Sequence, residues 1–193
     1  VLLSTNPISV AIPSGINPPI ILDMATSVAA YGKVKTLIQS GGTMPEGWMI
    51  DKNGNPLTDP AKSQDGFLLP IGGPKGYGLA LIFGILAGTL NGGAFGKDLI
   101  DFNADNTTVA NTGQFIIALD IEAFMDTERF KSQIDRIWAE MKSSAKLPGI
   151  SEIRIPGENL AKTVKERAAS GIKIPEPLFA SLTQIADELS IDR

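Results

Sequence analysis

The chain has 193 residues, of which 43% are hydrophobic and 20% are charged, a composition typical of a folded globular protein. It contains neither cysteine nor histidine, which excludes disulfides, thiolate zinc sites and a cysteine nucleophile and leaves any acid–base chemistry to Lys, Tyr, Asp or Glu. A net charge of −4 without a basic stripe argues against nucleic-acid binding. No apolar run approaches the roughly 18 residues that predict a membrane span.

Two short apolar runs near the start, Ile8 to Ile12 and Pro19 to Asp23, are separated by residues that favour a turn. We therefore predict a pair of strands. A helix is predicted next, with Ser27 as its N-cap and an end near Gln39, because Gly41 and the glycine after it stop a helix.

The middle of the chain is rich in glycine and proline. Residues 43–66 are predicted to form a long loop with one short strand at Trp48 to Ile50, and a loop of this length inside a domain is usually functional. The segment Gly72 to Gly78 is predicted to be a loop that leads into a buried helix over residues 79–90.

The last third of the chain is mostly helical in pattern. After a predicted buried strand at Gln114 to Asp120, we expect helices over 127–144, 158–169 and 177–189, with a short strand at Ile153 to Ile155 before the second of them. Strands come first and helices last, so an α+β fold is favoured over an alternating βαβ sheet.

The glycine-rich segment Gly72 to Gly78 is one candidate site. It presents several backbone N–H groups at a helix start beside Lys75, an arrangement that suits a phosphate or a carboxylate. Its spacing matches neither a Rossmann fingerprint nor a Walker loop. The alternative is a tight turn that needs glycine for its backbone conformation, with Lys75 simply solvated.

Two further candidates lie where a strand or loop meets a helix. Asp23 to Ser27 ends a predicted buried strand, a position at which ligands bind in many folds, although helix capping by Asp23, Thr26 or Ser27 is the favoured explanation when the segment is taken alone. Pro156 to Asn159 opens a helix with Glu158 in its first turn, where capping is again the favoured explanation and ligand contact the alternative. No spacing of acidic residues predicts a metal site.

Taken together, the motifs of this chain resemble one family over almost its whole length. That family is the malate/L-lactate dehydrogenase family of the non-Rossmann type, which includes ureidoglycolate, sulfolactate, diketogulonate and piperideine-carboxylate oxidoreductases. The matching segments, in order, are Ser4 to Ile8, Ile21 to Ser27, Pro45 to Trp48, Asp51 to Asn55, Asp59-Pro60, Leu69 to Gly73, Lys75 to Leu79, Ile155 to Glu158 and Gly171 to Pro175.

The resemblance implies a cofactor site. Members of the family bind NAD or NADP in a mostly antiparallel sheet domain that is not a Rossmann fold. By this resemblance, residues 1–144 form the NAD(P)-binding domain, and residues 145–193 form a C-terminal helical segment that packs on an N-terminal domain. The residues implied to contact the cofactor are Ile21, Leu22, Asp23, Met24, Ala25, Thr26, Ser27, Pro74, Lys75, Gly157, Glu158 and Asn159.

The resemblance also implies what this chain lacks. Family members carry a catalytic histidine and a substrate-binding arginine in a segment that precedes the match, so no catalytic residue is assigned here. The start of the chain, Val1 to Ser4, looks like a strand entered partway, and we expect a fragment or processed chain that is inactive without a missing N-terminal segment or companion chain.

Two functions follow. The first is the cofactor-binding portion of a cytoplasmic, homodimeric oxidoreductase that moves a hydride between nicotinamide and a 2-hydroxy or 2-oxo carboxylate. The second is a non-enzymatic module that binds a nucleotide or an anion. An interaction domain that keeps only the fold is disfavoured by Lys75 and by the intact Asp23 to Ser27 segment.

Overall fold

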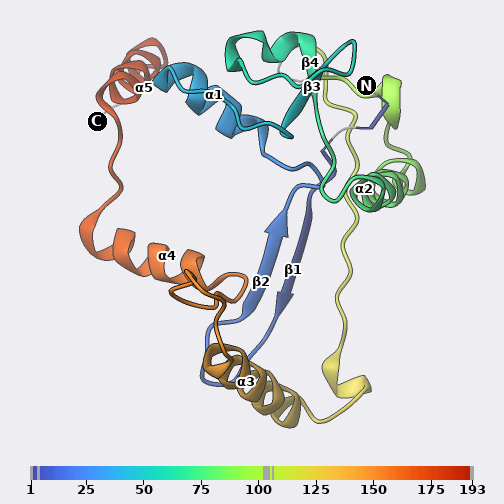
Figure 1. The fold of residues 1–193 in the computed structure, drawn as a ribbon, viewed down its shortest axis with the longest axis vertical. Coiled ribbons are helices and arrows are strands. Elements are labelled where there is room, and N and C mark those ends of the chain that lie inside the picture. Colours follow the sequence, from blue (N-terminus) through green and yellow to red (C-terminus); the bar gives the residue numbers. More distant parts are fainter. Residues whose placement is uncertain (1, 4, 102–104, 106, 192–193) are drawn as a thin grey trace.

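The structure is a computed structural model that describes residues 2–3, 5–101, 105 and 107–191. Two small antiparallel sheets and α1 come first along the chain and the other α-helices follow, in the open arrangement shown in Figure 1. The strands are β1 (Ile8–Ile12), β2 (Ile20–Met24), β3 (Met49–Asp51) and β4 (Gly66–Leu68). The helices are α1 (Tyr31–Ser40), α2 (Pro74–Ala87), α3 (Thr127–Ser143), α4 (Glu158–Ser170) and α5 (Glu176–Glu188).

The named strands form two separate antiparallel pairs. In the first, β1 pairs with β2 in a register that places Ile8 opposite Met24 and Ile12 opposite Ile20. In the second, β3 pairs with β4, and Met49 lies opposite Leu68. This mixture of helices and small antiparallel sheets confirms the α+β prediction at that level.

Two small hydrophobic clusters hold these elements together. Val34 of α1 packs with Met44 and Met49, which joins the helix to the β3–β4 pair. Ile134 and Trp138 of α3 pack with Ile155 and with partly buried side chains of β1 and β2. The second cluster therefore brings the loop before α4 next to the first hairpin.

A carboxylate on α3 fixes the turn between β1 and β2. Asp135 Oδ2 accepts the backbone N–H of Ile16 at 2.9 Å, and Asp135 Oδ1 accepts both the backbone N–H of Asn17 at 3.1 Å and its side-chain amide at 2.9 Å. These hydrogen bonds, led by that from Ile16, lower the pKa of Asp135. The hairpin is thus held at its turn as well as along its strands.

Several sequence predictions are confirmed with small shifts. The first strand pair and the three C-terminal helices occur within one or two residues of their predicted bounds. Helix α3 follows from its pattern, since Ile134 and Trp138 are its buried residues and Asp126 caps it by accepting the N–H of Arg129 at 2.7 Å. The short strand predicted at Trp48 to Ile50 is displaced by one residue, as β3.

Two helix starts were predicted wrongly. Helix α1 begins at Tyr31, and Ser27 does not cap it, because the Ser27 hydroxyl donates to the carbonyl of Ala29. Helix α2 begins at Pro74, earlier than the predicted residue 79. Proline is well suited to the first turn of a helix, since that position needs no N–H donor.

Two strand predictions were also wrong. Residues 114–120 are extended but belong to no strand, and they are exposed. The residues from Ile153 to Ile155 likewise form no strand. The carbonyl of Ile153 accepts from Lys142, and the N–H of Ile155 donates to the Glu158 carboxylate, so neither group takes part in strand pairing. Of the predicted strand at Val1 to Ser4, two residues lie outside the described part of the chain, and Leu2 and Leu3 are not in a strand. Among the described helices, none is long and apolar enough to cross a membrane.

Candidate functional site

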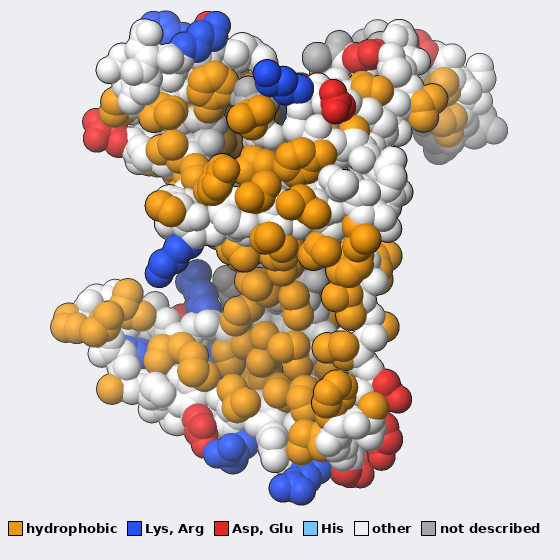
Figure 2. Space-filling model, turned by 90° about the vertical axis from the view of Figure 1, so that its right-hand side faces the viewer, with side chains coloured by type: hydrophobic (Ala, Val, Ile, Leu, Met, Phe, Trp, Pro, Cys, Tyr) orange, Lys and Arg blue, Asp and Glu red, His pale blue; other side chains and the backbone are white. Residues whose placement is uncertain are grey.

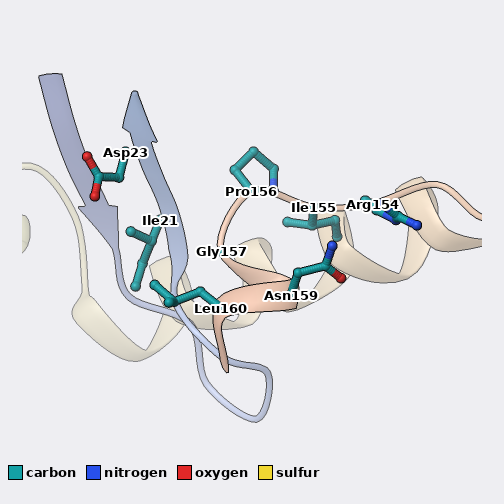
Figure 3. Close-up of a pocket in the computed structure, with 8 residues that line it drawn as sticks. All are labelled: Ile21, Asp23, Arg154, Ile155, Pro156, Gly157, Asn159 and Leu160. Atoms are coloured by element: carbon teal, nitrogen blue, oxygen red, sulfur yellow. The ribbon is translucent and has the colours of Figure 1, made fainter. Parts of the chain in front are cut away.

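A cavity of about 510 Å³ lies between β2 and the loop that precedes α4. Figure 3 shows Ile21 and Asp23 on the strand, with Pro156 and Gly157 in the loop beside them. The cavity brings together two segments more than a hundred residues apart in sequence. Its lining residues are Ile21, Asp23, Arg154, Ile155, Pro156, Gly157, Asn159 and Leu160.

The loop approaches the strand through its backbone. The N–H of Ile21 donates to the carbonyl of Pro156 at 3.0 Å. A Cβ added to Gly157 would lie 2.9 Å from both the N and the Cβ of Ile21, and Gly157 has a φ of +88°. Only glycine therefore fits this position without displacing the strand or straining the backbone.

An ion pair between α3 and α4 fixes the conformation of the same loop. Lys142 of α3 lies 2.6 Å from Glu158 Oε1 and 2.8 Å from Glu158 Oε2, and it also donates to the carbonyl of Ile153 at 2.9 Å. The N–H of Ile155 donates to Glu158 Oε2 at 3.1 Å. The Lys142 hydrogen bond, followed by that from Ile155, lowers the pKa of Glu158. The Glu158 carboxylate thus supports the cavity wall.

A second cavity, of about 340 Å³, shares Asp23 with the first as a lining residue. Two backbone hydrogen bonds hold the chain after β2 against residues 69–71: Val28 donates to the carbonyl of Leu69 at 2.9 Å, and Ile71 donates to the carbonyl of Thr26 at 2.9 Å. The residues that line it are Asp23, Met24, Ala25, Ser27, Val28, Ala29, Ala30, Lys33 and Ile71.

Asp23 is shared by the two cavities. Its side chain is exposed, and within the described part of the chain no hydrogen bond or ion pair engages its carboxylate. A carboxylate in this state is an acceptor for hydroxyl groups of a ligand. The alternative interpretation, that Asp23 caps a helix, is wrong because Asp23 lies within β2.

The glycine-rich segment Gly72 to Gly78, predicted as a candidate anion site, has glycines and backbone N–H groups that are used in packing and in the turn itself. A Cβ on Gly76 would overlap the carbonyl oxygen of Ile71, so this glycine allows α2 to lie against the preceding segment. The N–H groups of Gly73 and Lys75 donate within the turn, to Pro70 at 3.3 Å and Gly72 at 3.4 Å. Lys75 itself is exposed in the first turn of α2, where a helix favours anions.

The structure gathers most of the predicted cofactor residues at these cavities. Seven of the twelve positions line a cavity, and the other five line neither. Ile21, Asp23, Gly157 and Asn159 line the first cavity, and Asp23, Met24, Ala25 and Ser27 line the second. Thr26 is buried beneath, where its hydroxyl accepts the N–H of Asn6 at 3.3 Å, and Glu158 supports the wall. Leu22, Pro74 and Lys75 line neither cavity.

Three basic residues were missed. Arg154 lines the first cavity and pairs with Glu152 at 2.8 Å, while Lys33 lines the second. Lys142 acts through Glu158. The sequence held a weak signal for Arg154, a cation just before Pro156-Gly157, but none for the other two, because only tertiary packing brings them to the site. No group of acidic side chains within the described ranges could hold a metal ion.

Comparison with known proteins identifies the family. The family model for malate/L-lactate dehydrogenase matches residues 1–183. The chain belongs to this family. It is 38% identical over 191 residues to the malate/(S)-sulfolactate dehydrogenase of Methanothermus fervidus, a match that covers 99% of the chain and 54% of that protein.

Other members of the malate/L-lactate dehydrogenase family give the same picture. The NAD(+) ureidoglycolate dehydrogenase of Escherichia coli K12 is 33% identical, with 96% of the chain and 52% of that enzyme covered. The structure of sulfolactate dehydrogenase from Methanocaldococcus jannaschii superimposes with a TM-score of 0.85 at 37% identity, over 98% of the chain and 54% of that protein. The chain thus belongs to a family of oxidoreductases and spans about half the length of these relatives.

Proposed function

We propose that this chain binds NAD or NADP as part of a dehydrogenase that moves a hydride between nicotinamide and a 2-hydroxy or 2-oxo carboxylate. The observation that carries this proposal is the pair of cavities that share Asp23 as a lining residue. A dinucleotide has two halves joined by a pyrophosphate, and two cavities with a common lining residue would each receive one half. The bound cofactor would supply the hydride acceptor or donor.

The residues at the cavities fit a dinucleotide chemically. The Asp23 carboxylate would accept hydrogen bonds from ribose hydroxyls, while Arg154 and Lys33, one in each cavity, offer positive charge to phosphates. Lys75, in the first turn of α2, would contribute further charge from outside the cavities. Gly157 would let the loop lie close to the cofactor as it does to Ile21.

Proton transfer and substrate binding are assigned to another part of the enzyme. The sequence contains no histidine, and hydride transfer to a carbonyl carbon requires a proton donor beside it. We propose that a histidine and an arginine outside this chain supply these roles, and that activity depends on them. The relatives, named for malate, sulfolactate and ureidoglycolate, support a small carboxylate substrate.

The domain division and assembly belong to the same proposal. We assign residues 1–144 to the cofactor domain and 145–193 to a helical segment that packs on the remainder of the enzyme, in a cytoplasmic homodimer. Helices α4 and α5 support this assignment, because both expose hydrophobic side chains such as Val164 and Phe179, which are 59% and 58% exposed. Such helices normally bury an apolar face against a partner.

A fluorescence titration tests cofactor binding. NADH and NADPH are added separately while the quenching of tryptophan emission is followed. Trp138 is a suitable reporter, because it packs with Ile155, which lines the first cavity. We expect saturable binding that is weakened at least tenfold by Asp23→Ala and left unchanged by Asp65→Ala, a change at an exposed carboxylate remote in sequence. Equal affinity for wild type and Asp23→Ala would contradict the proposed site.

The alternative is a module that binds a nucleotide or an anion without catalysis. To separate the two, this chain can replace the matching 191 residues of the Methanothermus fervidus relative. We expect the chimera to reduce NAD or NADP with malate. A chimera that binds the dinucleotide but shows no turnover, while the parent relative is active, would favour the binding module.

A further inference from the structure

Residues 115–119 have the composition of a buried strand but the surroundings of an exposed one. The sequence Phe-Ile-Ile-Ala-Leu is apolar at every position, and Ile116, Ile117 and Leu119 are 85%, 66% and 75% exposed. Within the described part of the chain, no hydrogen bond engages the backbone of these five residues. Their neighbour Gln114 accepts one bond, at its carbonyl, from the Asn91 side chain at 3.0 Å.

The pattern of side chains identifies the kind of strand. Aromatic and β-branched residues favour extended structure, and in a strand successive side chains point to opposite faces. Because residues 115–119 are apolar without alternation, both faces require cover, as in a fully buried strand. A buried strand must also pair its N–H and C=O groups along both edges.

The exposed area of the whole chain is consistent with missing cover. The accessible surface is 14298 Å², whereas a folded monomer of this size exposes about 8,800 Å². Figure 2 shows a broad hydrophobic area on the side of the molecule where residues 115–119 and α2 lie. On α2, Ile82 and Ile85 are 53% and 41% exposed. An exposed apolar area of this extent marks an interaction surface.

We infer that residues 115–119 are a central strand of a sheet whose neighbouring strands come from the part of the enzyme outside this chain. The match covers 54% of the length of the Methanothermus fervidus relative, so that relative has nearly as much polypeptide again outside the match, from which such strands would come. This inference concerns assembly and does not depend on which ligand the cavities bind.

A second copy of this chain fits residues 115–119 less well as a partner. Around a two-fold axis, a strand pairs with its own copy along one edge only, which leaves the other edge unpaired. The excess area, roughly 5,500 Å² by the comparison above, also exceeds what one chain contributes to a standard interface of about 800 Å² per partner. Strands from another part of the same enzyme meet both requirements.

Hydrogen exchange distinguishes these occupants. Amide exchange is measured in this chain alone, at several concentrations, and in the chimera in which it replaces the matching residues of the Methanothermus fervidus relative. We expect exchange at residues 115–119 to be at least about 100-fold slower in the chimera. Unprotected amides at 115–119 in a chimera whose α3 amides are protected would overturn the inference. So would protection in the chain alone that rises with its concentration, since a second copy would then be the partner.

Variants test whether the backbone itself is paired. Ile117→Pro removes one N–H donor from the middle of the strand, and we expect it to abolish the protection at 115–119 and to lower the yield of folded chimera. The matched control is Val109→Pro, at a position 86% exposed and outside any helix or strand. Protection that survives Ile117→Pro would show that the segment is covered without strand pairing, which would also overturn the inference.

Discussion

Lys142 and Glu158 form an ion pair with 2.6 Å between Nζ and Oε1, which ties the last turn of α3 to the first turn of α4. The same two side chains also bind the backbone of Ile153 and Ile155. The loop between the helices is therefore fixed at Ile153 and Ile155, just before Pro156. The carbonyl of Pro156 in turn accepts the N–H of Ile21 in β2. The contact between this loop and β2, which is far from α3 in sequence, thus depends on a lysine of α3.

Replacement of Lys142 should loosen this loop. Lys142→Met keeps the length of the side chain but removes its charge and its hydrogen bonds, and we expect a loss of about 1 kcal/mol in stability because the pair is only partly buried. NADH affinity should fall as well, since the cavity wall shifts. Lys131→Met, which breaks the ion pair with Glu128 on the same helix, is the control. Equal NADH affinity in both variants would remove Lys142 from the support of the site.

Gly157 offers a test of close approach. Gly157→Ala places a methyl group 2.9 Å from Ile21 N, and Gly171→Ala places one at a similar φ of +82° with nothing within 4 Å. Both variants carry a backbone cost of about 1–3 kcal/mol, which thermal unfolding measures. We expect only Gly157→Ala to lose dinucleotide binding in the fluorescence titration. If both variants bind equally well, the contact between the loop and β2 is not needed for the site.

The elements that local chemistry determines were predictable. The apolar spacing that predicts α3 lies within the helix itself, and the residues that predict the turn between β1 and β2 lie within that turn. The same holds for the cavity residues of β2 and of the loop before α4, which were located through motifs. The roles of Lys142 and Lys33 could not be read locally, because these two residues reach the site only through packing.

Two errors have identifiable causes. The glycines before Leu79 suggested a loop. Gly76 instead lies within α2, where the absence of a side chain lets the helix pack against Ile71. A glycine needed for packing cannot be told from a loop glycine by residue type alone. The strand predicted at 114–120 depends on partners that local sequence does not specify. Its apolar composition describes a buried environment, and the described part of this chain does not provide one.

The carboxylate of Asp135 should titrate at unusually low pH. Hydrogen bonds from Ile16 and Asn17 lower its pKa from 3.8. A lowered folded-state pKa means that these bonds stabilise the hairpin above about pH 3.8 and that this contribution is lost as the pH falls through the folded-state value. The amide shifts of Ile16 and Asn17 in NMR spectra should therefore titrate with a midpoint below 3.8. Asp135→Asn should abolish that titration, whereas Asp65→Asn should not.

Lys75 provides the last test, because it is a predicted cofactor residue that lines neither cavity. If the positive charge at the start of α2 acts on the cofactor phosphates, Lys75→Ala should weaken NADH and NADPH binding by about 1–3 kcal/mol, as for a charge-assisted hydrogen bond. Lys97→Ala, at another exposed lysine outside both cavities, is the matched control. The loss should shrink as salt is added, because exposed charges are screened. An unchanged affinity for both cofactors would place the phosphates elsewhere, and Lys33→Ala and Arg154→Ala would then show which cavity receives them.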